Sequence, residues 1–273
     1  MNFIMTGYKG LIGSFLLEEL KKRGHNPVLL VDKKDGTDII DLDKIKLNEK
    51  CDLMIHLASF NKINKTIENP ELAFKNIALG TFRVLEFCRK NNIPKIVYTS
   101  SSRILEKEKN PYTAAKIFGE ELCKAYSQCY GIKYVIIRPS TVYGPRDINT
   151  PRVIPIFIQN ALHDKELKIY GDENKTLDFT YIDDFISGFL IAIKQENKEY
   201  DFGTGESTKL SEVADLIIKN IGKGRKVFER AEIAQPQNVG LDISGMRKLG
   251  YNPKISIEEG IERTIDWFKE KSL

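Results

Sequence analysis

Short apolar runs alternate with amphipathic stretches along the first half of the chain. The apolar runs are four or five residues long and partly β-branched, which is typical of strands buried on both faces, and they cover residues 3–6, 28–31, 53–57, 96–99 and 134–137. Helical spacing extends over 11–23, 71–91 and 112–130, and each of these stretches ends at or shortly before a glycine or proline. This alternation favours right-handed crossovers, so the sequence predicts an α/β fold with a doubly wound parallel sheet.

The pattern changes after residue 139. Four prolines, Pro139, Pro145, Pro151 and Pro155, fall close together and indicate a boundary or an irregular crossing. Beyond them helical spacing recurs over 153–163, 211–221 and 257–271, whereas 227–240 has weak periodicity and receives no assignment. The sequence therefore predicts a larger unit over residues 1–143 and a smaller lobe after it.

Composition and charge are those of a soluble globular protein. Of the 273 residues, 41% are hydrophobic and 29% charged, and the net charge of +4 is too small and too dispersed for a nucleic-acid surface. The apolar stretch over 185–193 is too short to cross a membrane, and the N-terminus lacks an export signal, so we expect a cytoplasmic protein. The four cysteines and three histidines have neither C-x-x-C nor metal-ligand spacing, so we expect no disulfide framework and no metal site.

A glycine-rich turn follows the first predicted strand. In T-G-Y-K-G-L-I-G, Gly7 permits a tight turn, Gly10 lets a pyrophosphate approach the backbone, and Gly13 allows close helix packing. Asp32 ends the second strand, where a carboxylate accepts a hydrogen bond from an adenosine ribose, and this favours NAD over NADP. The two lysines after Asp32 could instead hold a 2′-phosphate. The alternative to a cofactor site is a glycine-rich turn without ligand, with Asp32 solvated.

A second candidate site lies at the end of the fourth strand and in the helix after it. Tyr112 and Lys116 are four residues apart, hence on one helix face, and an ammonium near a phenol would lower the phenol's pKa towards that of a general base. Thr99 and the serines after it end a buried strand at its carboxyl end, where open α/β sheets bind ligands. Taken alone, the tyrosine and lysine fit a helix start and a solvated lysine better than a catalytic pair. The alternative for the hydroxyls is an ordinary polar strand exit.

A series of motifs in a fixed order extends these two sites along nearly the whole chain. They are T-G-x-x-G-x-x-G at 6–13, D-I-I-D at 38–41, H-L-A-S at 56–59, N-I-A-L-G-T at 76–81, S-S-S at 100–102, Tyr112 with Lys116, R-P-S-T-V-Y-G-P-R at 138–146, I-Y-G-D at 169–172, D-F-T-Y-I-D-D at 178–184 and D-F-G-T-G at 201–205. In this order they resemble the extended short-chain dehydrogenases, in particular the NAD-dependent epimerase/dehydratase family that includes UDP-glucose 4-epimerase.

The resemblance implies a Rossmann domain that binds NAD over residues 1–143, to which about 176–202 return, and a substrate lobe over 144–175 and 203–273. It implies catalytic roles for Ser101, Tyr112 and Lys116. The cofactor-binding residues that it implies, together with those of the glycine turn, are Gly7, Gly10, Leu11, Ile12, Gly13, Asp32, Asp38, Ile39, Leu57, Ala58, Ser59, Asn76, Thr99, Tyr112, Lys116 and Pro139. The residues that we expect to contact substrate are Ser101, Thr141 and Arg146.

The activity that the resemblance implies is epimerisation of a sugar, expected to be nucleotide-linked, by hydride transfer to NAD through a transient keto-sugar. Tyr112 would abstract the sugar hydroxyl proton. The same residues would serve an NAD(P)-dependent keto-sugar reductase, and a non-catalytic NAD-binding protein is a further alternative. A homodimer through the helices predicted over 71–91 and 112–130 would be typical of the family.

The chain departs from the family at its substrate contacts. Leu177 stands where the family has an arginine that contacts the nucleotide diphosphate, Glu232 lies where a second such arginine is expected, and Thr141 replaces an asparagine. Ser101 and Tyr112 are also eleven positions apart, so the loop between them is shorter than in relatives. One interpretation is that other cations bind the diphosphate; the candidates are Arg146, Arg152, Arg225 and Arg230. The other is that the substrate is not an ordinary nucleotide-sugar. We therefore expect weak turnover of UDP-glucose.

Overall fold

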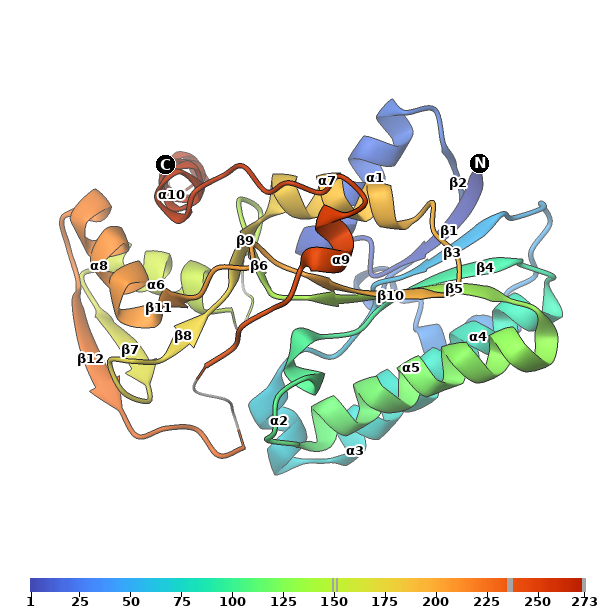
Figure 1. The fold of residues 1–273 in the computed structure, drawn as a ribbon, viewed down its shortest axis with the longest axis horizontal. Helices are drawn as coiled ribbons and strands as arrows, with labels where there is room; N and C mark the ends of the chain where they lie inside the picture. The colour runs from blue at the N-terminus through green and yellow to red at the C-terminus, as the bar shows by residue number, and fades with distance from the viewer. Residues whose placement is uncertain (149, 151, 235–237, 272–273) are drawn as a thin grey trace.

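Six parallel strands form the central sheet of the computed structural model, which describes residues 1–148, 150, 152–234 and 238–271 (Figure 1). The strand order is β10-β5-β4-β3-β1-β2, and neighbouring strands are parallel throughout. Their bounds are Asn2–Thr6 for β1, Asn26–Val31 for β2, Leu53–His56 for β3, Lys95–Thr99 for β4, Lys133–Pro139 for β5 and Lys198–Phe202 for β10. The five strands predicted from the apolar runs are confirmed, and the sixth comes from much later in the chain.

Helices cover both faces of this sheet, as a doubly wound fold requires (Figure 1). Helices α1 (Leu11–Lys22) and α7 (Ile182–Ala192) pack against each other on one face. Helices α4 (Gly80–Lys90) and α5 (Pro111–Tyr130) pack together on the other face. The predicted fold class is therefore confirmed.

The helix predicted over 71–91 is not a regular α-helix. It consists of α3 (Glu71–Ala73), a π-helical segment η3 (Phe74–Leu79) and α4, and the wider η3 turns were not visible in the spacing of apolar residues. Within η3, the Asn76 amide donates to the Leu72 carbonyl at 2.9 Å. Shorter helices complete this lobe: η1 (Lys33–Asp35), η2 (Ile39–Lys44), α2 (Ile63–Glu68) and η4 (Ser102–Ile104).

The second lobe, on the left in Figure 1, combines helices with two-stranded sheets. Its helices α6 (Val153–Leu162), α8 (Leu210–Ile221) and α10 (Ile257–Lys271) were predicted, and α9 (Ser244–Arg247) lies at the edge strand β10. The two-stranded sheets, which the sequence did not predict, are β6 (Thr141–Tyr143) with β9 (Phe179–Tyr181), β7 (Glu166–Tyr170) with β12 (Arg225–Glu229), and β8 (Thr176–Leu177) with β11 (Thr208–Lys209). Strand β12 extends into the segment over 227–240, which received no assignment from the sequence. Pro151 and residues 235–237 lie outside the described residues.

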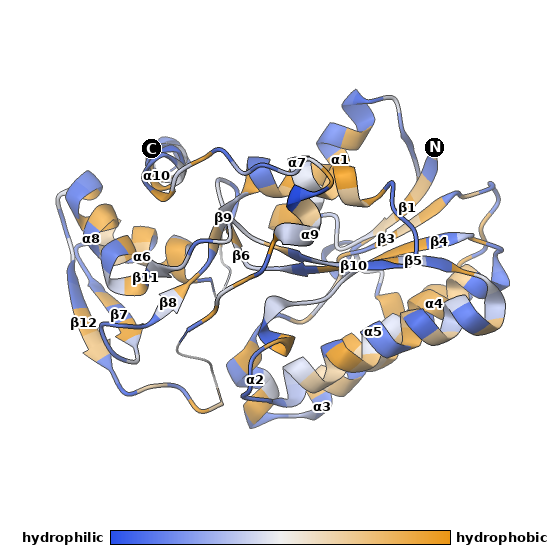
Figure 2. Cartoon of the chain, in the orientation of Figure 1, coloured by the Kyte–Doolittle hydropathy of each residue, from blue (hydrophilic) through white to orange (hydrophobic). Residues whose placement is uncertain are grey.

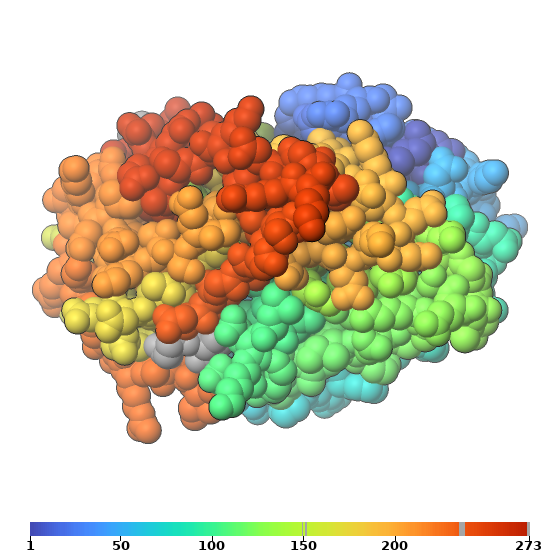
Figure 3. Space-filling view, viewed as in Figure 1, coloured from blue at the N-terminus to red at the C-terminus, as the bar shows by residue number. Residues whose placement is uncertain are grey.

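The two lobes share one hydrophobic core. A single cluster of buried side chains runs from Phe3 in β1 to Phe268 in α10, and a second cluster lies beneath α4 and α5. Figure 2 shows the apolar residues along the strands and the inner faces of the helices, and in Figure 3 the C-terminal segment lies across both lobes. Among the described residues no helix is both long and apolar enough to cross a membrane. The division at residue 143 remains a prediction.

Asp178, in the D-F-T-Y-I-D-D motif, holds the junction of the two lobes together. Its side chain is buried, and its two carboxylate oxygens accept hydrogen bonds from the Thr204 and Gly205 backbones at 3.0 and 2.8 Å. A Cβ on Gly203 would lie 2.4 Å from the same carboxylate, so only glycine lets this turn approach so closely. Asp178 therefore has a structural role in the motif: its carboxylate holds the Thr204–Gly205 turn in place.

We predict that Asp178→Ala lowers the free energy of unfolding by roughly 1 to 3 kcal/mol, because two part-buried N–H groups lose the buried carboxylate that accepts from them. Asp183→Ala is the matched control, since this nearby carboxylate is exposed and its pairing with Arg263 at 3.6 Å should contribute less than about 1 kcal/mol. Urea denaturation of both variants measures the difference. Equal effects would show that the Thr204–Gly205 turn does not depend on Asp178.

Candidate functional site

The glycine-rich turn between β1 and α1 lies against the end of β3. Gly7 has a φ of 76°, and a Cβ there would lie 2.6 Å from the Ala58 nitrogen; at Gly13 it would lie 2.3 Å from the Gly7 carbonyl oxygen. Gly10 is the N-cap of α1 and provides no side-chain cap, so the first N–H groups of the helix are left for an anion. The turn therefore has the shape and the donors of a pyrophosphate cradle, and Leu11 and Ile12 supply two of those N–H groups.

Asp32 lies beside this turn. Its carboxylate accepts hydrogen bonds from the backbones of Lys9 and Lys34, each at 3.0 Å, and so links the end of β2 to the glycine turn. Lys33 points elsewhere and pairs with Asp38 at 2.9 Å. The structure thus places the carboxylate where the sequence predicts it, and its contact with a ribose remains a prediction.

The carboxyl ends of β3 and β4 supply unpaired hydroxyls next to the turn. The Ala58 nitrogen donates to Thr6 Oγ1 at 3.2 Å, which fixes the Leu57–Ser59 exit against β1. The hydroxyl oxygens of Ser59, Thr99 and Ser100 are buried and have no hydrogen-bond partner among the described residues. Because buried polar groups are normally satisfied, these hydroxyls fit a bound polar ligand such as NAD.

His56, at the end of β3, is a structural residue. Its Nδ1 and Nε2 lie 2.8 Å from Thr6 Oγ1 and 3.3 Å from Thr81 Oγ1, so the ring connects two strands with α4. Burial, together with the charge of Lys116, lowers the pKa of His56 to about 3. The imidazole is therefore neutral at physiological pH.

The first turn of α5 presents the candidate catalytic residues. Asn110 caps the helix, its side chain accepting from the Thr113 nitrogen at 3.1 Å, and this places Tyr112 and Lys116 on the face towards the sheet. Both side chains are buried, and Lys116 Nζ donates to the Thr99 carbonyl at 2.7 Å and lies 5.2 Å from the centre of the Tyr98 ring. Ser101 lies close enough to the Tyr112 phenol to lower its pKa, so the structure brings the three predicted catalytic residues together.

The electrostatics of this site differ from the expectation. Burial raises the pKa of Tyr112, and the effects that oppose it come from the Ser101 hydrogen bond and from Arg103 and Arg152. Burial also lowers the pKa of Lys116 to about 7, against the attraction of Glu120. The Lys116 ammonium is directed to the Thr99 carbonyl, and the two cations that act against the raised pKa of Tyr112 are the guanidinium groups of Arg103 and Arg152. Activation of the phenol by Lys116 stays a prediction.

Several other predicted residues make contacts that belong to the fold itself. Asn76 is bonded within its own helix, and Ile39 packs with its Cδ1 against Gly80, where a Cβ would lie 2.5 Å away. Pro139 ends β5, and the Thr141 nitrogen donates to the Asp178 carbonyl at 3.0 Å.

The candidate arginines are spread over the molecule. Arg146, with a φ of 69°, bonds to Glu18 at 3.0 Å and lies 4.5 Å from the centre of the Phe15 ring on α1. Arg225 is exposed and bonds to Glu166 on the outer sheet of the small lobe.

Arg152, by contrast, acts on Tyr112, and the buried Asp147 holds its guanidinium at 2.8 Å. Two further cations near the site were not predicted. Arg103 directly follows the serines of the catalytic strand exit, and Lys175 stands two residues before Leu177.

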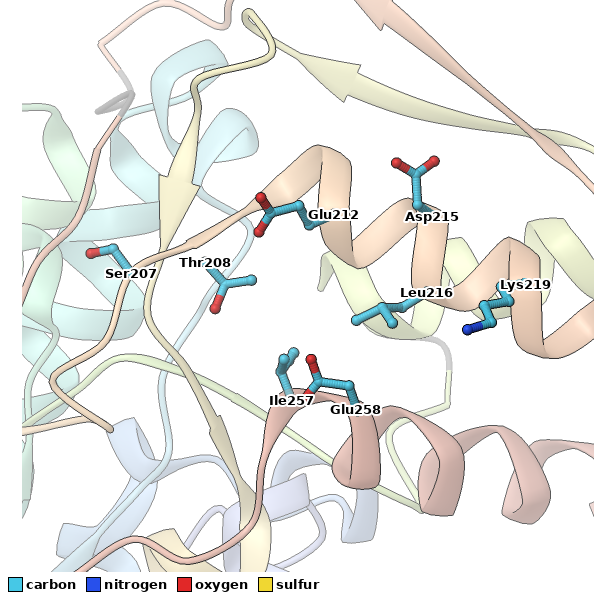
Figure 4. Close-up of a pocket in the computed structure, with 8 residues that line it drawn as sticks. All are labelled: Ser207, Thr208, Glu212, Asp215, Leu216, Lys219, Ile257 and Glu258. Atoms are coloured by element: carbon cyan, nitrogen blue, oxygen red, sulfur yellow. The ribbon is translucent and has the colours of Figure 1, made fainter.

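A cavity of about 450 Å³ lies in the small lobe (Figure 4). It opens between α8 and the N-terminal end of α10, and no residue of the predicted site lines it. Its lining consists of Ser207, Thr208, Glu212, Asp215, Leu216, Lys219, Ile257 and Glu258. The candidate site is therefore the sheet edge at β1, β3 and β4, and not this cavity.

Known proteins share both the sequence pattern and this fold. A family model described as "NAD dependent epimerase/dehydratase family" matches residues 3–203. The chain belongs to this family. A relative from Methanocaldococcus jannaschii, with the provisional name of a UDP-glucose 4-epimerase, is 32% identical over 98% of this chain and 99% of its own.

Two solved structures resemble the chain over nearly its whole length. The UDP-glucose 4-epimerase of Thermotoga maritima, solved with UDP-glucose, is 25% identical, with a TM-score of 0.92 and full coverage of both chains. The UDP-glucose 4-epimerase of Thermus thermophilus, solved with NAD, is 26% identical, with a TM-score of 0.90 over 98% of this chain and 99% of that one. The resemblance stated from the motifs is confirmed.

We predict that the buried Lys116 makes the stability of the cofactor-free protein depend on pH. Its pKa is about 7 when folded and near the ordinary 10.4 when unfolded, so between these values the unfolded state binds more protons. The free energy of unfolding should therefore rise with pH in this window, by up to about 1.4 kcal/mol per pH unit, relative to Lys116→Met. Urea denaturation of both proteins at about pH 7.5 and 9.5 measures this, and parallel behaviour would contradict it.

We also predict that the chain binds NAD more tightly than NADP, because the Asp32 carboxylate would repel a 2′-phosphate. Asp32→Asn keeps an acceptor for the turn but removes the charge, so calorimetry should show the preference narrowing by about tenfold. Asp266→Asn, an exposed change on α10, is the control and should leave the preference intact. Tighter binding of NADP by the unaltered protein would refute the assignment.

Proposed function

We propose that this protein is an NAD-dependent epimerase that inverts one carbon of a nucleotide-linked sugar through a transient keto-sugar. The proposal rests above all on the grouping of Ser101, Tyr112 and Lys116 at the carboxyl end of β4, on the same sheet edge as the glycine turn. Family membership and the UDP-sugar and NAD complexes of the structural relatives support it.

NAD would be held by the glycine turn, by Asp32 and by the unpaired hydroxyls of Ser59 and Thr99, with Lys116 at its ribose. When bound, it supplies a reversible hydride acceptor. The residues of the chain that move the proton are Tyr112 and Ser101: the phenolate takes the proton from a sugar hydroxyl, and the Ser101 hydroxyl orients the phenol. Arg103 and Arg152 stabilise the phenolate that must form.

The burial of Tyr112 and Lys116 would keep water away from the keto-sugar intermediate. Tyr112 and Lys116 are both nearly inaccessible in the described structure, and the Lys116 ammonium is held rigidly by the Thr99 carbonyl. A base such as Tyr112 that is held in one position is oriented for proton transfer more of the time. The same residues would serve a keto-sugar reductase, and the two activities differ in whether external NAD(P)H is consumed.

We also propose a homodimer and a cytoplasmic location. Phe74 in η3 and Phe118 in α5 are large apolar side chains exposed on the helical face where the resemblance implies the interface, with exposed fractions of 63% and 46%. The four cysteines are free thiols, which agrees with a reducing compartment. Light scattering would measure the assembly directly.

We predict that Tyr112→Phe reduces turnover by about 10² to 10⁴-fold, because it removes the ionisable hydroxyl and keeps the ring. NAD binding should survive, since the glycine turn and Asp32 are untouched. Sugar turnover followed by NMR, with calorimetry of NAD, tests both parts. Tyr126→Phe on the same helix is the control, because this hydroxyl bonds to Glu86 away from the site. Near-normal turnover by Tyr112→Phe would remove Tyr112 from the mechanism.

A further inference from the structure

An ionic cluster of five side chains joins helix α5 to the outer edge of the central sheet. Arg138, in β5, donates through Nε to a carboxylate oxygen of Glu120 on α5 at 2.8 Å, and its Nη2 contacts Glu199 on the edge strand β10. The Nη1 of Arg138 lies 3.5 Å from Asp201, which is also on β10. Lys124, one turn after Glu120 on α5, pairs with Glu199 at 2.9 Å. The cluster therefore connects α5, β5 and β10 through charged side chains.

Glu120 is the most deeply buried carboxylate of this ionic cluster, and it shares a helix face with Lys116. Both residues are 3% exposed. They are four residues apart in α5, so one helical turn separates them and their Cβ atoms are about 5 to 6 Å apart. The Lys116 ammonium is bonded to the Thr99 carbonyl, and the Glu120 carboxylate acts on it through space, with little solvent to weaken the attraction.

The charges of the ionic cluster balance when Lys116 is counted with it. The three carboxylates of the cluster face its two cations, which leaves one negative charge in excess. Glu121 also pairs with Lys124, but its side chain is exposed to solvent. An uncompensated charge is costly where solvent is scarce, and the Lys116 ammonium lies one turn from the buried carboxylate of Glu120. Burial lowers the pKa of Lys116, and the charge of Glu120 opposes this effect.

The other titratable groups around Lys116 are neutral. The ring of Tyr98 on β4 lies 5.2 Å from the ammonium, and burial raises the pKa of its phenol. Burial also raises the pKa values of Tyr112 and Cys123, which lie on α5 before and after Lys116, so both keep their protons. His56 on β3 is uncharged because its pKa is about 3. Within the described part of the chain, the ionic cluster is therefore what offers Lys116 a full negative charge.

We propose that Glu120, fixed by Arg138, is a positioning residue that keeps the Lys116 ammonium charged at the candidate site. Arg138 donates to both carboxylate oxygens of Glu120, so the carboxylate is held in place and acts on the site through Lys116. The inference rests on the proposed function for what the ammonium does, which is to hold the cofactor ribose and to favour the phenolate of Tyr112. A neutral amine would lack the charge for both.

Loss of the Glu120 charge should lower the pH at which folded Lys116 gives up its proton. The pKa of Lys116 is about 7 when folded and about 10.4 when unfolded, so the free energy of unfolding rises with pH above about 7. Without the carboxylate the folded pKa falls further and the unfolded pKa is unchanged, so this rise should begin about one pH unit lower. A residue with only a structural role would change the stability equally at each pH.

The test is urea denaturation of the full chain and of Glu120→Gln, each compared with the same protein carrying Lys116→Met, at about pH 5.5, 6.5 and 7.5. The part of the free energy of unfolding that depends on Lys116 should already rise between the first two pH values in Glu120→Gln, and mainly between the last two in the unaltered chain. Glu121→Gln is the matched control, because this neighbouring carboxylate is exposed and pairs with Lys124 at 3.0 Å. Asp201→Asn removes another carboxylate of the cluster, so it should act in the same direction by less, and it carries the test if Glu120→Gln does not fold.

Calorimetry of NAD measures the same change at the candidate site. The affinity of Glu120→Gln for NAD should be roughly 5-fold weaker than that of the unaltered chain at about pH 7.5 and nearly equal at about pH 5.5, because the charged fraction of Lys116 recovers. Glu121→Gln should match the unaltered chain at both pH values.

An unchanged pH profile of unfolding in both Glu120→Gln and Asp201→Asn overturns the proposal, and so does an equal shift in Glu121→Gln. Turnover is assayed separately. A shifted unfolding profile in a protein that epimerises no UDP-sugar would refute the proposed activity and leave the effect of Glu120 on Lys116 standing.

Discussion

The buried ammonium of Lys116 is the constraint on which the candidate site depends. It is fixed by one carbonyl, that of Thr99 at the carboxyl end of β4, and it lies over the ring of Tyr98. A buried cation is costly unless it is held this well, so helix α5 and strand β4 cannot move apart without exposing or unpairing it. Because Tyr112 is one helical turn earlier, the same contact also places the phenol next to Ser101. The geometry of the proposed proton transfer therefore follows from how one lysine is accommodated.

The two lobes depend on each other in a similar way. The core is continuous from β1 to α10, and Asp178 ties the turn after β10 to the small lobe. The segment with Glu232 adds a third connection, to α2 and the start of α5. The two lobes are therefore joined at several separate points.

The parallel sheet and the glycine turn could be predicted from the sequence because local pattern determines both. Apolar runs identify buried strands, and Gly7 and Gly13 occupy positions where a Cβ would collide with backbone. The π-helical turns of η3 and the two-stranded sheets could not be predicted, since tertiary packing decides such short elements. The hydrogen bonds that join Glu232 to α2 and Ala234 to Asn110 could not be predicted for a related reason: each joins residues that are far apart in the sequence. The resemblance supplied Ser101 as a partner of Tyr112. The spacing of Tyr112 and Lys116 could not show that burial raises the pKa of the phenol and lowers that of the ammonium.

The proposed epimerisation requires that hydride leaves one carbon and returns to that same carbon within one site. A UDP-sugar that carries deuterium at the ring carbon whose configuration inverts tests this directly, with mass spectrometry of the product formed in ordinary water. We expect the product to retain its deuterium and no reduced cofactor to accumulate. Loss of the deuterium to solvent, or net formation of NADH with one equivalent of keto-sugar, would contradict the proposed chemistry.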